Sequence, residues 1–252
     1  MARRRFFVDQ VRNGRAELAG EGAEHLRRVL RAAPGDRLEI SDNRSVYLAE
    51  IEGFRKGAAI LRLLEPLAVD EPALRITLLA SLIKFDRFEW IIEKATELGA
   101  GAIVPVAAAR SERGLERAAA KRLERWRRIA LESSQQCRRA RLPAIEDAAD
   151  FAHAVRTRDA FRYLLDEESS GPALAEALPP AGERPAAAGV SLLLGPEGGW
   201  TGGERQAAIE AGWTRVSLGP TILRAETAAI AALAVLRCVW PAGRATPPQP
   251  PR

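Results

Sequence analysis

Residues 190–204 read VSLLLGPEGGWTGGE, an apolar run followed directly by a glycine-rich loop. The apolar run predicts a buried strand. Gly195, Gly198 and Gly199 would let backbone groups of the loop approach a ligand closely. Thr201 is placed to cap the next helix, and Glu204 three residues later would complete a capping box. The loop has neither a G-K-[ST] nor a G-x-G-x-x-G spacing, so a nucleotide phosphate loop is not indicated.

A second loop of the same kind lies at residues 215–227, which read RVSLGPTILRAET. A short predicted strand, 215–218, enters it, and an apolar helix, 226–239, follows it. Arg224 and Glu226 stand at the entrance of that helix. Ligands of parallel α/β sheets bind at the carboxyl ends of strands, so both loops are candidates for one site.

The rest of the chain after residue 74 alternates in the same way. The predicted strands cover 74–83, 102–106, 162–165, 190–194 and 215–218, and the helices cover 87–98, 116–136, 203–211 and 226–239. The helix at 87–98 places Phe88, Ile91, Ile92 and Ala95 on one face, and Gly99 is a natural stop. Alternating strands and helices predict an α/β fold with a parallel sheet covered on both faces.

The first seventy residues follow a different pattern. Short strands are predicted at 5–8, 37–40, 45–51 and 58–64, with one helix at 23–31 that has Leu26, Val29 and Leu30 on one face. This pattern predicts a small β-barrel. An acidic, proline-containing stretch at 65–72 marks a domain junction, and the residues after Trp240 are rich in proline. We therefore expect domains at 1–70 and 72–241 and a disordered tail at 242–252.

Composition narrows the function classes. The chain has 252 residues, and 38 Lys+Arg against 33 Asp+Glu give a net charge of +5, which is weak support for a nucleic-acid partner. Two isolated cysteines and two isolated histidines predict neither a disulfide framework nor a metal site, and no role is assigned to His25 or His153. The longest uncharged apolar stretch, Thr227–Leu236, is about half a membrane span. These features predict a soluble cytoplasmic protein.

Both loops strongly resemble the signature loops of the ribosomal RNA small-subunit methyltransferase E family, which consists of SPOUT-type enzymes. Further resemblance lies in KFDRFEWIIEKATELG at 84–99, in RSE at 110–112, in the segment 136–143, and in HLRRVLR at 25–31 with Gly35-Asp36. The match covers about residues 5–240. The resemblance implies a PUA-like β-barrel followed by a SPOUT domain with a parallel sheet and a C-terminal trefoil knot. It also implies a homodimer whose active site is completed across the interface.

The family methylates N3 of a uridine in 16S ribosomal RNA and uses S-adenosylmethionine as its cofactor. By resemblance, Arg224 would stabilise the developing uracil anion, and Glu197 or Glu226 would accept the imide proton or orient Arg224. The residues expected to bind the cofactor are Leu194, Gly195, Pro196, Glu197, Gly198, Gly199, Leu218, Gly219, Ile222, Leu223, Arg224 and Thr227.

The expected partner is 16S ribosomal RNA, either free or in the 30S subunit. Because N3 lies on the Watson–Crick edge, the target base must be unpaired or flipped out. The candidate RNA-binding residues are Arg4, Arg5, Arg28, Arg31, Arg110, Arg138, Arg139 and Arg141. Two positions depart from the family pattern: Thr221 replaces a basic residue and Arg138 replaces a glycine.

Three other functions remain open at this point. A SPOUT methyltransferase with another target, such as a ribose 2′-hydroxyl or another base, would bind the cofactor with the same loops. A non-catalytic RNA-binding or ribosome-assembly protein would have no need of a glycine-dense cradle. A metabolic nucleotide enzyme would need a phosphate-binding motif or metal ligands, and the sequence shows neither.

Overall fold

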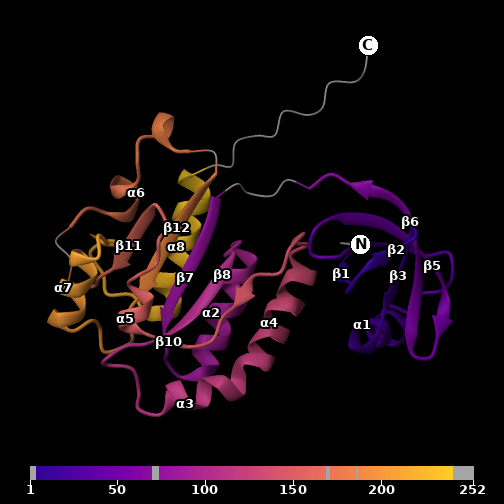
Figure 1. Ribbon diagram of the computed structural model, residues 1–252, viewed down its shortest axis with the longest axis horizontal. Coiled ribbons are helices and arrows are strands. Elements are labelled where there is room, and N and C mark those ends of the chain that lie inside the picture. Colours follow the sequence, from indigo (N-terminus) through magenta and orange to yellow (C-terminus); the bar gives the residue numbers. More distant parts are fainter. Residues whose placement is uncertain (1–3, 70–73, 169–170, 186, 241–252) are drawn as a thin grey trace. The chain divides into compact units, whose positions relative to one another are not determined.

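The computed structural model describes residues 4–69, 74–168, 171–185 and 187–240 (Figure 1). The chain forms two compact units. One comprises Met1–Glu71 together with Leu131–Leu142, and the other comprises Pro72–Ala130 and Pro143–Arg252. The segment Leu131–Leu142, which lies inside the second predicted domain, therefore groups with the first unit. The predicted proline-rich tail lies outside the described residues.

The first unit is built on a six-stranded sheet with the order β1-β4-β5-β6-β3-β2. All neighbours pair antiparallel except β1 and β4, which pair parallel. Phe6, Ile40, Ile51 and Leu61 fill its core. The four predicted strands are confirmed, and two short strands were not foreseen. The strands are β1 (Arg5–Phe7), β2 (Val11–Arg12), β3 (Arg15–Leu18), β4 (Arg37–Ser41), β5 (Val46–Arg55) and β6 (Ala58–Leu67).

The predicted helix at 23–31 is only partly right. The chain forms α1 (Gly20–Glu24) and then one π-helical segment, η1 (His25–Val29). The Leu30 N–H donates to the His25 carbonyl at 3.0 Å, a bond that spans five residues instead of four. This wider turn changes the face on which later residues lie. Leu26 is buried as expected, but Val29 and Leu30 are 64% and 49% exposed, so the predicted apolar face is wrong for these two residues.

The second unit holds a parallel sheet with the order β10-β8-β7-β12-β11-β13, and β9 pairs with β8. This confirms the predicted parallel α/β sheet and its five strands. The strands are β7 (Leu74–Ser81), β8 (Ala102–Ala107), β9 (Ala144–Ile145), β10 (Ala149–Asp150), β11 (Phe161–Leu165), β12 (Ala188–Leu194) and β13 (Thr214–Val216).

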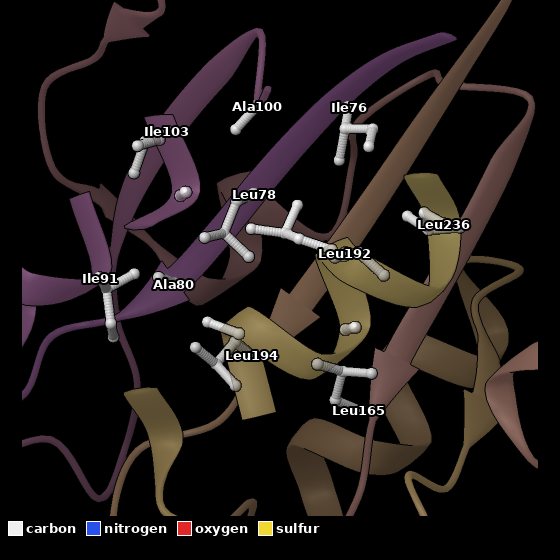
Figure 2. Close-up of a cluster of buried hydrophobic side chains, with 14 of the residues drawn as sticks. Ile76, Leu78, Ala80, Ile91, Ala100, Ile103, Leu165, Leu192, Leu194 and Leu236 are labelled. Atoms are coloured by element: carbon white, nitrogen blue, oxygen red, sulfur yellow. The ribbon is translucent and has the colours of Figure 1, made fainter. Parts of the chain in front are cut away.

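Helices cover both faces of this sheet. On one face α8 packs against β12 and α2, and Figure 2 shows Leu78, Leu192 and Leu236 within the cluster that they share. On the other face, residues of α5 and α7 pack with Leu79, Leu193 and Trp200. The helices are α2 (Phe85–Glu97), α3 (Leu115–Ala119), η2 (Ala120–Arg122), α4 (Leu123–Gln136), α5 (Phe151–Ala154), α6 (Leu174–Ala177), η3 (Ala181–Glu183), α7 (Gly202–Glu210) and α8 (Ala225–Val239).

The helix α2 shows how local sequence determines this layer. Phe88, Ile91, Ile92 and Ala95 are all buried, as their spacing predicts, because residues three and four apart share one helix face. Gly99 follows the helix with φ +83°, a left-handed conformation that favours glycine. The predicted helix at 116–136 is instead divided into α3, η2 and α4.

Candidate active site

A cleft of about 540 Å³ opens at the carboxyl ends of three neighbouring strands. Leu165, the last residue of β11, pairs in register with Leu194 of β12 and with Val216 of β13. The loops that leave these strands therefore start side by side. The cleft is lined by residues 165–167, 194–199 and 217–225, together with Arg87 and Ala228. Both loops singled out from the sequence thus meet in one cleft.

The glycine-rich loop after β12 is held by several internal contacts. The Gly199 N–H donates to the Pro196 carbonyl at 2.9 Å, and Gly199 has φ +68°. Trp200 is fully buried, and its indole N–H donates to the Leu165 carbonyl at 3.0 Å. Thr201 and Glu204 form the predicted capping box of α7, with the Glu204 N–H donating to Thr201 Oγ1 at 3.2 Å. The loop has a defined shape because Trp200 ties it to the end of β11 and Thr201 ties it to the start of α7.

The second loop brings Arg224 to the cleft. Arg224 is the N-cap residue of α8 and is exposed, and within the described part of the chain its side chain forms no ion pair or hydrogen bond. A guanidinium that lines a cleft and has no internal partner is available to a ligand. Glu226 points elsewhere: it is 5% exposed and does not line the cleft, and its Oε2 has no hydrogen-bond partner among the described residues.

Glu197 lines the cleft but is not free. Its carboxylate accepts a short hydrogen bond from Arg87 of α2, and both side chains are partly exposed. Arg87 also lines the cleft, and it was not among the residues selected from the sequence. The spacing of α2 places Arg87 on a polar face, so only the tertiary fold shows that this face borders the cleft.

Two acidic residues directly after β11 were also missed by the sequence analysis. Asp166 and Glu167 follow Leu165 directly and line the cleft. Asp166 has no exposed side-chain surface and accepts hydrogen bonds from Arg205 at 3.1 Å and from Arg215 at 2.7 Å. Burial lowers the pKa of Arg205, but its hydrogen bond to Asp166 and the nearby carboxylates outweigh burial and raise that pKa overall. The rule that ligands bind at strand ends could have identified these two acids, since they follow a predicted strand.

The candidate cofactor-binding residues are almost all brought together. Only Thr227 lies outside the residues that line the cleft. Those that line it are Leu194, Gly195, Pro196, Glu197, Gly198, Gly199, Leu218, Gly219, Ile222, Leu223 and Arg224. Thr221, one of the departures from the family pattern, also borders the cleft.

The candidate RNA-binding arginines do not all lie on the surface. Arg5 is 7% exposed, and its guanidinium donates to Glu39 at 3.0 Å and to the Arg138 carbonyl at 2.6 Å. Arg5 is therefore bonded inside the first unit, and its expected role at an RNA surface stays a prediction that its burial does not favour. Arg4 is exposed and lies 3.1 Å from His25 Nε2.

The remaining arginines are distributed between both units. Arg28 and Arg31 are exposed on or after η1. Arg138 has φ +60° and also pairs with Glu39, while the Arg139 side chain donates to the Arg141 carbonyl at 3.0 Å. These three residues belong to the segment that groups with the first unit. Arg110 belongs to the second unit and donates to two carbonyls of the glycine-rich loop.

The described residues contain no cluster of three or more His, Cys, Asp or Glu side chains that could hold a metal ion. Their helices are also too short or too polar to span a membrane.

Comparisons with known proteins agree with this geometry. Residues 70–237 match the family described as RNA methyltransferase domain, and residues 18–64 match the family described as RNA methyltransferase PUA domain. The ribosomal RNA small subunit methyltransferase E of Synechocystis is 34% identical over 236 residues, covering 92% of this chain and 75% of that protein. The protein of that name from Mycobacterium tuberculosis is 33% identical over 250 residues, covering 94% and 93%.

Solved structures extend the likeness to three dimensions. The crystal structure of a ribosomal RNA small subunit methyltransferase E from Neisseria gonorrhoeae, bound to S-adenosyl methionine, superimposes with a TM-score of 0.84 at 29% identity and covers 94% of this chain and 98% of that chain. A Legionella pneumophila protein in complex with the cofactor SAM gives a TM-score of 0.83 at 28% identity and covers 95% and 99%. The fold class expected from the sequence, a PUA-like β domain followed by a SPOUT-like α/β domain, is confirmed, while the threading of the trefoil knot stays a prediction. This chain belongs to the ribosomal RNA small subunit methyltransferase E family.

Proposed function

We propose that this protein transfers a methyl group from S-adenosylmethionine to N3 of a uridine in 16S ribosomal RNA. The observation that carries the proposal is the cleft at the ends of β11, β12 and β13, where the glycine-rich loop faces the loop that bears Arg224. Family membership supports the same reaction.

The residues present fit the cofactor. A cleft of about 540 Å³ is of the size that small-molecule ligands occupy. Its walls combine apolar side chains, such as Leu194 and Leu218, with backbone groups and the partly exposed carboxylate of Glu167. We propose that the cleft residues of the two loops hold the cofactor, which when bound would supply the methyl group on a sulfonium leaving group. Thr227 would contribute only through the helix that it helps to begin.

Methylation of N3 requires loss of the imide proton and stabilisation of the negative charge on the uracil oxygens. We assign the second task to Arg224, because its guanidinium lines the cleft and stays unpaired within the described residues. A fixed cation beside a developing anion lowers the barrier most where water is excluded. Of the two candidate proton acceptors, we favour Glu197, since it lines the cleft and Glu226 does not. Arg87 would orient the Glu197 carboxylate.

We assign RNA recognition mainly to the first unit. The candidate arginines there are Arg4, Arg28, Arg31, Arg138, Arg139 and Arg141, and their grouping on one unit supports a single footprint. Arginine suits this role because its planar fork binds phosphate through two hydrogen bonds. Under this proposal, residues 1–70 together with 131–142 form the RNA-binding unit, and the rest of the predicted domain 72–241 forms the catalytic unit.

We also propose that the protein acts as a homodimer in the cytoplasm. Ile222, on the rim of the cleft, is 82% exposed in the single chain. A single exposed apolar residue is ordinary on a protein surface, so this part of the proposal rests on the resemblance to the family, which implies a homodimer. Sedimentation equilibrium of the full chain should give twice the monomer mass, and a monomer that is fully active would contradict this part.

The reaction is tested with purified full-length protein and S-adenosylmethionine carrying a labelled methyl group. The substrates are 30S subunits and free 16S ribosomal RNA from a strain that lacks this gene. We expect the label in 3-methyluridine after digestion and mass spectrometry. Label in a 2′-O-methylated nucleoside or in another base would contradict the proposed target and favour the alternative SPOUT activity. Cofactor binding without any transfer to RNA would contradict the proposed reaction.

A further inference from the structure

We propose that Arg110 is a positioning residue that holds the glycine-rich loop in its cofactor-binding shape, and that it does not serve as an RNA contact. The proposal rests on the proposed function, because it assumes that this loop binds S-adenosylmethionine. It replaces the role that the sequence suggested for Arg110.

The contacts of Arg110 carry the proposal. Arg110 follows β8, and its Nη1 donates to the Gly198 carbonyl at 2.9 Å and to the Trp200 carbonyl at 3.3 Å. Gly198 lines the cleft, whereas Arg110 does not. The guanidinium therefore binds the loop without lining the cleft itself, and it donates to two carbonyl groups that lie two residues apart.

The residue before Arg110 also connects the segment after β8 to the glycine-rich loop. The Ala109 N–H donates to Glu204 Oε1 at 2.7 Å, and the other carboxylate oxygen of Glu204 accepts from the Thr201 N–H at 2.9 Å. Glu204 is 8% exposed, so this carboxylate is well shielded from water. Two successive residues, Ala109 and Arg110, thus bind the stretch 198–204 at both ends.

The segment that carries Arg110 is itself closed into a turn. The Ser111 N–H donates to the Ala108 carbonyl at 3.0 Å, and Ser111 Oγ accepts from the Ala108 N–H at 3.3 Å. The loop also packs on the stem of Arg110, because a Cβ placed on Gly198 would lie 3.2 Å from Arg110 Cβ. The turn 108–111 thus holds the Arg110 backbone in a fixed conformation, from which its side chain can bind the flexible glycine-rich loop.

The loop needs such support because of its composition. Gly198 and Gly199 have wide backbone freedom, so the peptide planes on either side of them can rotate at little energetic cost. Fixing the carbonyls of Gly198 and Trp200 removes that freedom before a ligand arrives. Preorganisation of this kind raises affinity because the ligand no longer has to order the loop. Loss of the Arg110 side chain should therefore weaken cofactor binding more than it weakens folding.

The test compares two arginines that are three positions apart. Arg110→Met removes the two hydrogen bonds to the loop, and Arg113→Met removes an equal charge from an exposed residue whose side chain forms no hydrogen bond or ion pair within the described part of the chain. Calorimetric titration with S-adenosylmethionine should give a Kd about tenfold higher for Arg110→Met, as expected for losing charge-assisted hydrogen bonds, and an unchanged Kd for Arg113→Met. Arg110→Lys keeps the charge and a donor and should recover part of the affinity.

Steady-state rates separate positioning from RNA contact. We expect Arg110→Met to raise the KM for S-adenosylmethionine while the KM for 30S subunits and the salt dependence of their binding stay as in the wild type. An unchanged cofactor Kd, together with weaker 30S binding and a salt slope reduced by about 1, would identify an RNA phosphate contact and overturn the proposal. Equal effects of Arg110→Met and Arg113→Met would also overturn it. If the wild-type chain bound no S-adenosylmethionine, the proposed function itself would fail.

Discussion

Replacing Gly199 by alanine should damage the cofactor cleft more than its small size suggests. Gly199 has φ +68°, and a non-glycine residue in this left-handed region costs about 1–2 kcal/mol. The new Cβ would clash with Glu167 Oε1, so the carboxylate must move. That oxygen accepts from Arg205 at 3.0 Å, and loss of such a partly exposed ion pair costs about 0.5 kcal/mol. The free energy of unfolding should therefore fall by about 2 kcal/mol.

The same chain offers a matched control for this change. Gly202 is the first residue of α7, and a Cβ there meets no atom within 4 Å. Gly202→Ala should leave the free energy of unfolding unchanged or raise it slightly, since alanine favours helices. Urea unfolding measures both variants, and calorimetric titration with S-adenosylmethionine should show at least a tenfold loss of affinity for Gly199→Ala alone, which is about 1.4 kcal/mol. If the two variants behaved alike in both assays, the reasoning about this loop would be wrong.

Three further changes test other parts of the structure. Asp166→Asn should lower the free energy of unfolding by about 3 kcal/mol in urea, because it removes the shielded carboxylate that Arg205 and Arg215 share, and a loss below about 1 kcal/mol would refute this. Glu39→Gln should cost a similar amount by removing the buried partner of Arg5, again measured in urea, whereas an unchanged midpoint would show that the pair adds no stability. Burial, and then Arg4, lower the pKa of His25, so stability should fall as the pH drops below about 6.5, the ordinary histidine pKa, and His25→Gln should remove that part of the profile.

Much of the second unit could be predicted because the sequence patterns that indicate its helices and loops involve residues close together in the chain. Apolar spacing identified α2, and the pair Thr201 and Glu204 predicted the start of α7 through a contact only three residues long. Both cleft loops were found because glycine-rich stretches follow apolar strands. In each case the interaction that determines the structure lies within a few residues of the signal.

The features that were missed depend on contacts between distant segments. Arg87 borders the cleft only because α2 lies beside a loop 110 residues later, where it meets Glu197. Arg5 looked like a surface charge because its buried partner, Glu39, lies on another strand. The π-helical segment η1, in which Val29 is exposed, depends on a changed backbone hydrogen-bond pattern that apolar spacing does not reveal.

The grouping of residues 131–142 with the first unit is of the same kind. Ser41 Oγ donates to the Ala140 carbonyl at 2.5 Å, and the Leu142 N–H donates to Asn43 Oδ1 at 2.7 Å. Both bonds span 99 residues. Pattern reasoning assigns a segment to the domain in which it lies along the chain, so it had no means of finding this grouping.

The central claim is that Arg224, at the mouth of the cleft, supports methylation of uracil N3 in 16S ribosomal RNA. The most direct measurement is mass spectrometry of nucleosides from the 16S ribosomal RNA of a strain that lacks this gene, complemented with the wild-type gene or with Arg224→Ala. The account predicts that 3-methyluridine is absent from the deletion strain, returns with the wild-type gene and does not return with Arg224→Ala. Undiminished 3-methyluridine in the deletion strain would contradict the assigned reaction, and full restoration by Arg224→Ala would contradict the role of this residue.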